Sequence, residues 1–502
     1  MKKIILAIAF VFSVININAQ HKILDKNFWT AKPNLEEVKK EIKGFDFKTI
    51  QGSDDPLFLA ISNDADINVI KFLADQPDVN FARTIHEGRI YLHSTVTKNN
   101  LGATQYLIDK GSDINLIDAN GHTPVTFGGF NGSLSPEMLD LLYKNGLDLN
   151  KKYENKEGAN ILLLLLLSIG YDNDLRITNY LISKGISIQS VDSFGHNAIY
   201  HAAKIGNVDI IKYLISKGVN PQPETLIAAA QGTYKSANKI DIYKYLIDEL
   251  KLNPKIVDEK GQNLLHLVTK KQNQDEVVQY LISKGVDAKL IDKDGNSPFM
   301  NSTNGKSLVV VKLLYPFNKN INSVNKDGDS PINNAIKNST GEIVEFLIKN
   351  GANVDLKDKE NKNLAYVLIE SFREPRNFGR LPQKEQKDDF KLKLEALQKN
   401  GIDFSKSFYD GNTIYHLAVE KNSLDLLKKL KGINVDINAK NNEGFTALQK
   451  AALIAKNDEI MKYLISLGAS KEFRTDLDET AYDLAKDNEE LSKNKISIEF
   501  LK

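Results

Sequence analysis

One stretch of sequence, from Asp327 to Lys359, recurs with variations along the whole chain. Its opening, DGDSP, predicts a turn followed by a helix start, because Ser330 is a good N-cap and Pro331 suits the first helical position. Apolar residues at helical spacing then predict a short first helix, and a second one from Glu342 that Gly351 would end. Two such helices bury too little surface to fold alone, so the unit must stack on copies of itself.

Copies of this unit follow one another at a nearly constant period. The step from Asn263 to Ser297 is 34 residues, and the next step, to Ser330, is 33 residues. This period is typical of solenoids built from helix pairs. The positions equivalent to Ser330 define 13 units, and they are Asp55, Ile90, Thr123, Asn160, Asn197, Glu224, Asn263, Ser297, Ser330, Asn363, Thr413, Thr446 and Thr480.

The unit resembles the ankyrin repeat. That family's Gly-x-Thr-Pro-Leu-His-x-Ala pattern is approached by GNTIYHLA from Gly411, and its Gly-Ala-Asp-x-Asn ending by GANVD from Gly351. The resemblance implies an all-α helical solenoid of about 13 two-helix units joined by short β-hairpin turns. It also implies that the chain binds another protein through its hairpin tips and first-helix surfaces.

The ends of the chain depart from the repeat. MKKIILAIAFVFSVININA, residues 1–19, is typical of a secretory signal peptide cleaved near Ala19 and Gln20. We therefore expect an exported bacterial protein, periplasmic or secreted. Residues 20–50 are expected to form an N-terminal capping half-unit with a helix over 33–42, residues 51–477 the repeat array, and residues 478–502 a C-terminal capping repeat.

Composition excludes several classes of protein. The chain has 66 Lys and Arg against 65 Asp and Glu, so a nucleic-acid partner is not expected. It has no Cys, which excludes disulfides and thiol chemistry. The apolar run from Ile161 to Leu167 is too short to insert into a membrane and is expected to be a buried first helix. We expect a monomer without a cofactor.

The spacing between successive anchor residues, the positions equivalent to Ser330, is irregular at two places in the array. The connection around Pro221 and Pro223 is short, so it is expected to lack a full hairpin finger and to be the weakest joint between units. Residues 370–389 form an insertion between two helices of one unit. Arg373, Arg376 and Arg380, with Phe372 and Phe378, could bind an anionic ligand there, although a loop of this length costs little and needs no function.

The histidines are expected to have structural roles and not to bind metal or catalyse a reaction. His93, His266 and His416 occupy the histidine position of the family pattern, where the resemblance implies hydrogen bonds between neighbouring units. They lie too far apart along the stack to share a metal ion. His122, His196 and His201 lie in or beside predicted turns and are expected to be exposed.

No pattern of residues predicts catalysis or metal binding. The turn from Asp292 resembles the start of an EF-hand loop, but Thr303 stands where the bidentate acid is needed. Phosphate-binding, dinucleotide-binding and nucleophile-elbow motifs do not occur in the sequence. A column of tyrosines at one position of the second helix is expected to serve packing. Its members are Tyr106, Tyr180, Tyr213, Tyr245, Tyr280 and Tyr463.

The preferred hypothesis from sequence is a non-enzymatic, protein-binding scaffold of the cell envelope. The alternatives are a secreted effector or an inhibitor that occludes an enzyme, and a ligand-binding protein that uses the insertion. Variable turn residues are the candidates for partner contact. They are Asp118, Asn120, His122, Asp292, Asp294, Lys326 and Asp327.

Overall fold

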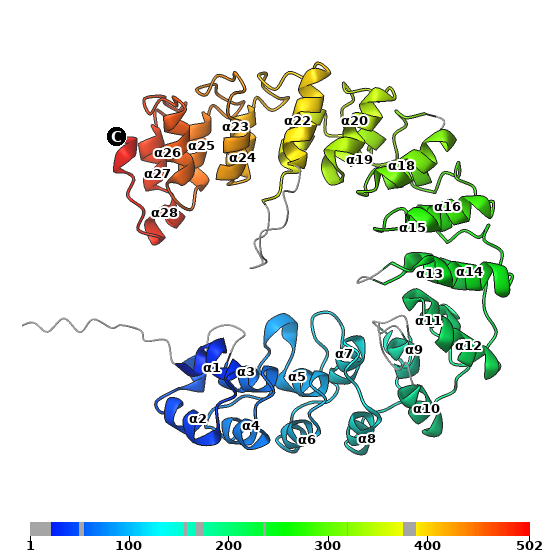
Figure 1. Cartoon of the computed structure of the whole chain (residues 1–502). Coiled ribbons are helices and arrows are strands. Elements are labelled where there is room, and N and C mark those ends of the chain that lie inside the picture. The colour runs from blue at the N-terminus through cyan, green and yellow to red at the C-terminus, as the bar shows by residue number, and fades with distance from the viewer. Residues whose placement is uncertain are drawn as a thin grey trace, which may run out of the picture. The chain divides into compact units, whose positions relative to one another are not determined.

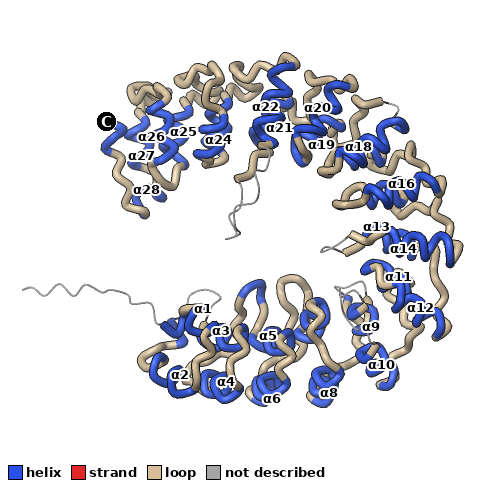
Figure 2. Tube along the Cα trace, in the orientation of Figure 1, coloured by secondary structure: helices blue, strands red, loops and turns tan. Residues whose placement is uncertain are grey.

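Helices and turns make up nearly all of the structure (Figure 1 and Figure 2). The computed structural model describes residues 22–49, 55–154, 158–166, 175–233, 237–318, 320–374 and 388–502. The expected signal peptide at 1–19 and residues 375–387 of the insertion lie outside these ranges. Within them, β structure is limited to isolated antiparallel bridges such as that between Val257 and Asn263, at the base of a turn.

The chain forms two compact units, one ending at Thr225 and the other beginning at Leu226. The division falls in α13 (Thr225–Gln231), shortly after Pro221 and Pro223. The expectation that this joint is the weakest in the array stays a prediction.

Each repeat begins with a first helix, and the anchor residue, at the position equivalent to Ser330, lies directly before it. Ser330 caps α19 (Pro331–Asn338), where its hydroxyl accepts a hydrogen bond from the Asn333 N–H at 3.3 Å. All thirteen predicted anchors directly precede a first helix in the described part of the chain. These helices are α3 (Pro56–Ser62), α5 (Tyr91–Thr97), α7 (Pro124–Phe130), α9 (Ile161–Leu165), α11 (Ala198–Ile205), α13, α15 (Leu264–Val268), α17 (Pro298–Ser302), α19, α21 (Leu364–Glu370), α23 (Ile414–Glu420), α25 (Ala447–Ile454) and α27 (Ala481–Lys486).

A second helix follows each first helix and packs beside it. The first residue of α20 is Gly341, and a side chain at this position would collide with Leu392 of the next repeat. In most repeats a glycine in the left-handed conformation follows this helix, as Gly351 does at φ 92°. The second helices are α4 (Ile67–Ala74), α6 (Leu101–Asp109), α8 (Pro136–Lys144), α10 (Arg176–Ser183), α12 (Val208–Ser216), α14 (Ile240–Lys244) with η5 (Tyr245–Glu249), α16 (Asp275–Ser283), α18 (Leu308–Leu314), α20 (Gly341–Lys349), α22 (Asp389–Lys399), α24 (Leu424–Lys429), α26 (Glu459–Ser466) and α28 (Glu489–Lys493).

Within each compact unit the helices pack in two layers. First helices contact first helices, as in the series α3, α5, α7, α9 and the series α15, α17, α19, α21. Second helices do the same, as in α2 (Leu35–Glu41), α4, α6, α8 and in α14, α16, α18, α20, α22. The core is the seam between the two layers, and apolar side chains such as Leu107, Ile336 and Leu347 are fully buried there.

The N-terminal cap has two helices, whereas the sequence predicted one. The predicted helix is α2, which packs against α4. Before it, α1 (Lys26–Thr30) packs against α3, so the cap covers both layers. Its Trp29 is almost fully buried and donates a hydrogen bond to the Ile23 carbonyl at 2.8 Å.

The two predicted irregularities fall between helices. Residues 217–224 join α12 to α13 without a bridge, and Gln222 fastens this short connection to the preceding turn by donating to the Gly195 carbonyl at 2.8 Å. The insertion lies between α21 and α22, so the two-layer stack continues past it.

Replacing Ala335 by Asp should destabilise the array locally. Ala335 is fully buried in α19, between α17 and α21. An unpaired carboxylate there should cost a few kcal/mol. Because each repeat contacts only its neighbours, hydrogen exchange measured by mass spectrometry should show the loss of protection concentrated in the adjacent repeats.

The matched control is Val309→Asp, which adds the same charge at a position of α18, in the preceding repeat, that is 53% exposed. This variant should keep the protection of the wild type. A uniform loss of protection over all repeats in Ala335→Asp would contradict the expectation.

Candidate functional site

Three histidines hydrogen-bond to the next repeat. Nδ1 of His93, His266 and His416 accepts a backbone N–H at the start of its own helix, at 3.3, 3.3 and 3.1 Å. Because a backbone N–H can only donate, the proton of each neutral imidazole is on Nε2. That Nε2 donates to a carbonyl of the following turn, at 3.1, 3.0 and 2.9 Å. Each ring therefore links two repeats, and burial lowers its pKa.

One repeat makes the same link with a glutamine. The Thr446 N–H donates to Gln449 Oε1 at 2.9 Å. Gln449 Nε2 donates at 3.3 Å to the Glu479 carbonyl, which is equivalent to the carbonyls that the histidines reach, and also at 2.9 Å to the Phe473 carbonyl. The amide thus replaces both nitrogens of the imidazole without a titrating group. Glutamine is consequently a conservative replacement for the three histidines.

Asn333 stands at the same position and is too short to make this link. It is 1% exposed, and neither amide atom of its side chain has a hydrogen-bond partner among the described residues. A buried polar group without a partner costs about 1–3 kcal/mol. Asn333 is therefore a weak point in the contact between α19 and α21.

Asp118 and Asp292, two of the candidates for partner contact, are almost fully buried. Each is 5% exposed, because its carboxylate is turned into its own hairpin. Asp292 Oδ1 accepts the N–H groups of Asp294 at 3.0 Å and Asn296 at 2.7 Å, and Asp118 Oδ1 accepts those of Asn120 at 2.9 Å and His122 at 2.8 Å. These aspartates shape the turns, whereas the residues directly after them are exposed.

The remaining candidates lie on the surface of the turns. Asn120, Asp294, Lys326 and Asp327 are exposed, and His122 is partly exposed. Neighbouring turns are tied by backbone hydrogen bonds, such as that from the Lys326 N–H to the Asp294 carbonyl at 2.8 Å. The tips within one compact unit are therefore held next to each other by the backbone.

The sequence analysis missed an exposed aliphatic side chain directly before many of the turns. A β-branched residue that precedes the turn aspartate or asparagine is half exposed in several repeats, although such residues favour burial. Three of them stand in consecutive repeats of the second compact unit. We call the set the finger row, and its members are Ile117, Val191, Val257, Ile291 and Val324.

His201 is buried, so its predicted exposure is wrong. It is 2% exposed, and its Nε2 lies 3.2 Å from Asp192 Oδ2. The same oxygen is 3.1 Å from His196 Nδ1, and the His196 ring stacks on Tyr200 with 3.7 Å between centroids. The helical position of His201, four residues after the Asn197 cap, places it under the turn rather than on it.

The tyrosine column connects neighbouring second helices. The hydroxyls of Tyr106 and Tyr280 donate to Asp75 at 2.6 Å and to Asp248 at 2.9 Å, each across to the preceding repeat. A lysine one turn later pairs with the same carboxylate, as Lys284 does with Asp248 at 2.5 Å. These tyrosines stabilise the stack, as expected from their periodicity.

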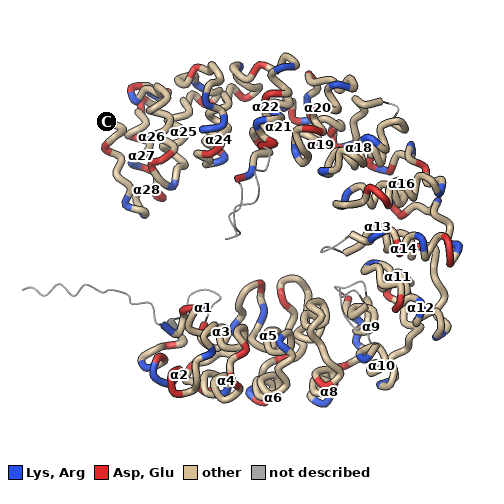
Figure 3. The backbone as a smooth tube through the Cα atoms, in the orientation of Figure 1, with Lys and Arg blue, Asp and Glu red and all other residues tan. Residues whose placement is uncertain are grey.

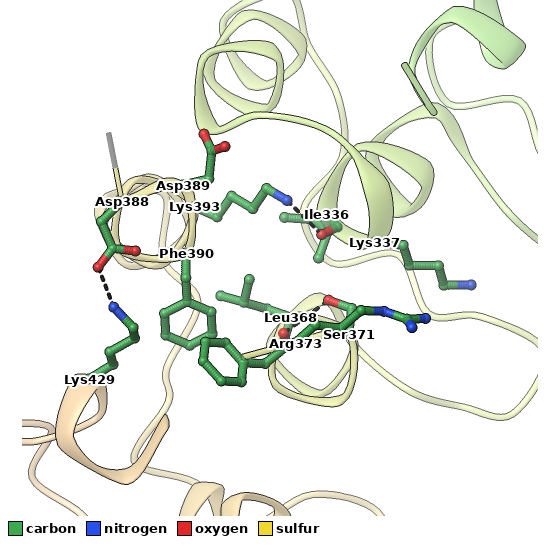
Figure 4. Close-up of a pocket in the computed structure, with 11 residues that line it drawn as sticks. Ile336, Lys337, Leu368, Ser371, Arg373, Asp388, Asp389, Phe390, Lys393 and Lys429 are labelled. Atoms are coloured by element: carbon green, nitrogen blue, oxygen red, sulfur yellow. Dashed lines mark hydrogen bonds and ion pairs between the residues drawn. The ribbon is translucent and has the colours of Figure 1, made fainter. Parts of the chain in front are cut away.

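An open pocket of about 430 Å³ lies beside the insertion, between α19, α21 and α22 (Figure 4). Lys393 of α22 and the pair Phe372 and Phe390 line it, and so do Arg373 and Asp388 at the two described ends of the insertion. Arg376, Phe378 and Arg380, which the sequence analysis also proposed, lie outside the described residues.

The described residues show no arrangement for metal binding or membrane insertion. No group of three or more histidines and carboxylates among them is placed to hold a metal ion. Among the described helices, not one has both the length and the apolar character needed to cross a bilayer.

Comparison with known proteins finds one family along most of the chain. Residues 36–153, 164–258, 226–315, 265–358 and 387–485 match the family described as "Ankyrin repeats (3 copies)". The fowlpox virus protein named "Putative ankyrin repeat protein FPV022" is 24% identical over 280 residues, which is 51% of this chain and 46% of that protein. The alignment thus spans less than half of that relative's length.

Two further similarities cover parts of the chain. The Saccharomyces cerevisiae protein named "Probable 26S proteasome regulatory subunit p28" is 33% identical over 168 residues, which is 32% of this chain and 70% of that protein. The crystal structure of the human ASB11 ankyrin repeat domain matches at 21% identity and a TM-score of 0.37, covering 45% of this chain and 92% of that one.

Replacing His416 by Ala should lower the free energy of unfolding by about 1–3 kcal/mol, because two buried hydrogen bonds are lost. His416→Gln is the control, since Gln449 makes both bonds in the next repeat. Urea unfolding should place the Gln variant near the wild type and the Ala variant clearly below it. Equal midpoints for the two variants would contradict the assigned role.

The stability of the wild type and of His416→Gln should differ in its dependence on pH. Burial lowers the pKa of folded His416, whereas an unfolded histidine has a pKa of about 6.5. The unfolded chain then binds more protons below about pH 6.5, so the stability present above this pH is lost as the pH falls through it. Urea unfolding between pH 7.5 and 5 should show a smaller loss in His416→Gln than in the wild type, and equal losses would refute the assignment.

Asn333→Gln should raise the free energy of unfolding by about 1 kcal/mol, because the longer amide can make the link that Gln449 makes. Asn338→Gln, at an exposed position of the same helix, should leave it within a few tenths of a kcal/mol. A lower urea midpoint for Asn333→Gln would show that the site has no room for the extra methylene.

Proposed function

This chain belongs to the ankyrin-repeat family, and from that premise we propose that it is a non-enzymatic scaffold of the cell envelope that binds another protein as a monomer. The observation that carries the proposal is the finger row. Aliphatic side chains that stand half exposed beside polar turn tips suit a protein partner, because covering them releases water while the tips supply hydrogen bonds.

The charge distribution supports a protein partner over a nucleic acid. Basic and acidic residues are interspersed along both compact units (Figure 3), and the tips repeat this mixture, as in Lys326 beside Asp327. A nucleic-acid surface would need basic residues gathered on one face. The exposed tip residues Asn120, Asp294, Lys326 and Asp327 are the proposed polar contacts.

The proposed location rests on residues 1–19. Two lysines followed by an apolar run and a small residue before Gln20 are typical of an exported precursor. Mass spectrometry of the native protein should find an N-terminus near Gln20, and fractionation should find the protein outside the cytoplasm. An intact Met1 in a cytoplasmic fraction would refute export, and recovery from the medium would favour a secreted effector or inhibitor.

Affinity capture with matched variants tests the binding role. Val324→Asp places a charge in the finger row and should reduce recovery of a stoichiometric partner by about tenfold or more, since about 1.4 kcal/mol suffices for that factor. Val309→Asp is the control, because Val309 lies on α18 and is 53% exposed, against 54% for Val324.

The wild type and Val309→Asp should recover the same partner in equal amounts. Equal recovery by Val324→Asp would remove the finger row from the binding surface. If the tagged mature chain captures no stoichiometric partner from envelope extracts, the scaffold proposal itself is wrong.

A further inference from the structure

The pocket beside the insertion contains a buried cation. Lys393 is 7% exposed, and its aliphatic stem extends outward from α22 toward Ile336 at the end of α19 (Figure 4). Its Nζ donates to the Ile336 carbonyl at 3.0 Å. An ammonium has three N–H groups, and among the described residues no carboxylate lies within 4.0 Å of this one. Burying a charge with so little compensation is costly.

The other charged groups around the pocket are already paired or lie at its edge. Asp388 accepts from Lys429 at 2.6 Å, and Asp389 accepts the Gly341 N–H at 3.0 Å. Neither of these described carboxylates forms an ion pair with the ammonium within 4.0 Å, although the charge of Asp389 acts on it from further away. The remaining charges that face this region are Lys337, which pairs with Asp329 at 2.7 Å, Arg373, which is exposed, and Lys306.

Burial lowers the pKa of Lys393 to about 8. The nearby charge of Asp389 raises this pKa without offsetting the burial, and the amine is still mainly protonated at neutral pH. A bound carboxylate would raise the pKa, since an opposite charge favours the protonated form.

Another part of the pocket lining is apolar. Phe372 and Phe390 pack edge to face with 5.2 Å between ring centroids, and Leu368 lies beside them. The volume of about 430 Å³ falls within the range of ordinary small-molecule sites. A buried cation and an aromatic wall in one pocket are complementary to a ligand that has one anionic and one apolar end.

We propose that this pocket binds a small organic carboxylate, whose charged group lies on the Lys393 ammonium and whose apolar body lies against Phe372 and Phe390. Arg373 lies at the rim, where it attracts the anion. This site goes beyond the proposed scaffold function, because it takes a small molecule and does not include the finger row. The alternative role of Lys393 is only to cap the C-terminal end of α19.

A ligand panel on the full mature chain distinguishes the two roles. The panel contains phenylacetate, octanoate, acetate and phenylacetamide, the last being an uncharged analogue of phenylacetate. Titration calorimetry should find that phenylacetate or octanoate binds at least about tenfold more tightly than acetate, which lacks the apolar body, and that phenylacetate binds at least about tenfold more tightly than phenylacetamide.

Two lysine variants locate the site. Lys393→Met keeps the length of the stem and removes the charge, so affinity should fall by at least about tenfold while the protein stays folded, because an apolar isostere of a buried charge is tolerated. Lys391→Met is the control on the same helix, because Lys391 is exposed and, among the described residues, pairs with Glu395 at 3.8 Å. It should leave the affinity within about twofold.

The pH dependence gives a readout that a purely structural lysine would not show. Because the ligand needs the ammonium, the affinity of the wild type should fall by about tenfold per pH unit above the pKa of the free protein. Absence of binding by every carboxylate of the panel at millimolar concentration would overturn the proposal. So would equal binding of phenylacetamide and phenylacetate, or full affinity in Lys393→Met.

Discussion

Burial of short helices against their neighbours is the interaction on which this structure depends. Some first helices are as short as α15, which has five residues from Leu264 to Val268. Four of these five residues are fully buried. A helix of this length is unstable in water by itself. Its apolar surface is covered only because a repeat stands on either side, so no repeat has a core of its own.

Hydrogen bonds between repeats fix the orientation of each repeat on its neighbour, which apolar burial alone does not. The histidines and Gln449 bond to the next turn, the turn tips bond through their backbones, and tyrosines on the second helices bond to carboxylates of the preceding repeat. Since these bonds recur at equivalent positions, each repeat is held to its neighbour in both layers. Where a side chain is too short, as at Asn333, the layer contact remains but its polar atoms stay unsatisfied.

The sequence predicted the repeats well because helix starts are determined locally. A cap such as Ser330 followed by proline, or Thr446 followed three residues later by Gln449, predicts a start without knowledge of the neighbours. Burial was predicted less well, because it depends on what packs above each residue. The predicted exposure of His201 was therefore wrong, Asp118 and Asp292 are buried although they were candidates for partner contact, and helix α1 was not predicted.

The candidate sites were less predictable for the same reason. The finger row consists of ordinary valines and isoleucines, and only their exposure makes them notable. Lys393 looks in the sequence like any lysine of a surface helix. It is buried where α22 meets the end of α19, which belongs to a neighbouring repeat. The finger row thus recurs because the repeats are similar, whereas the pocket around Lys393 lies where the chain departs from the repeat.

The central claim is that stability is shared only between neighbouring repeats. Hydrogen exchange of the wild type, followed by mass spectrometry at increasing urea below the main transition, tests this claim most directly. The account predicts that protection is lost in blocks of adjacent repeats at different urea concentrations. Simultaneous loss of protection in all helices at one urea concentration would contradict it, because that result requires a single core shared by the whole chain.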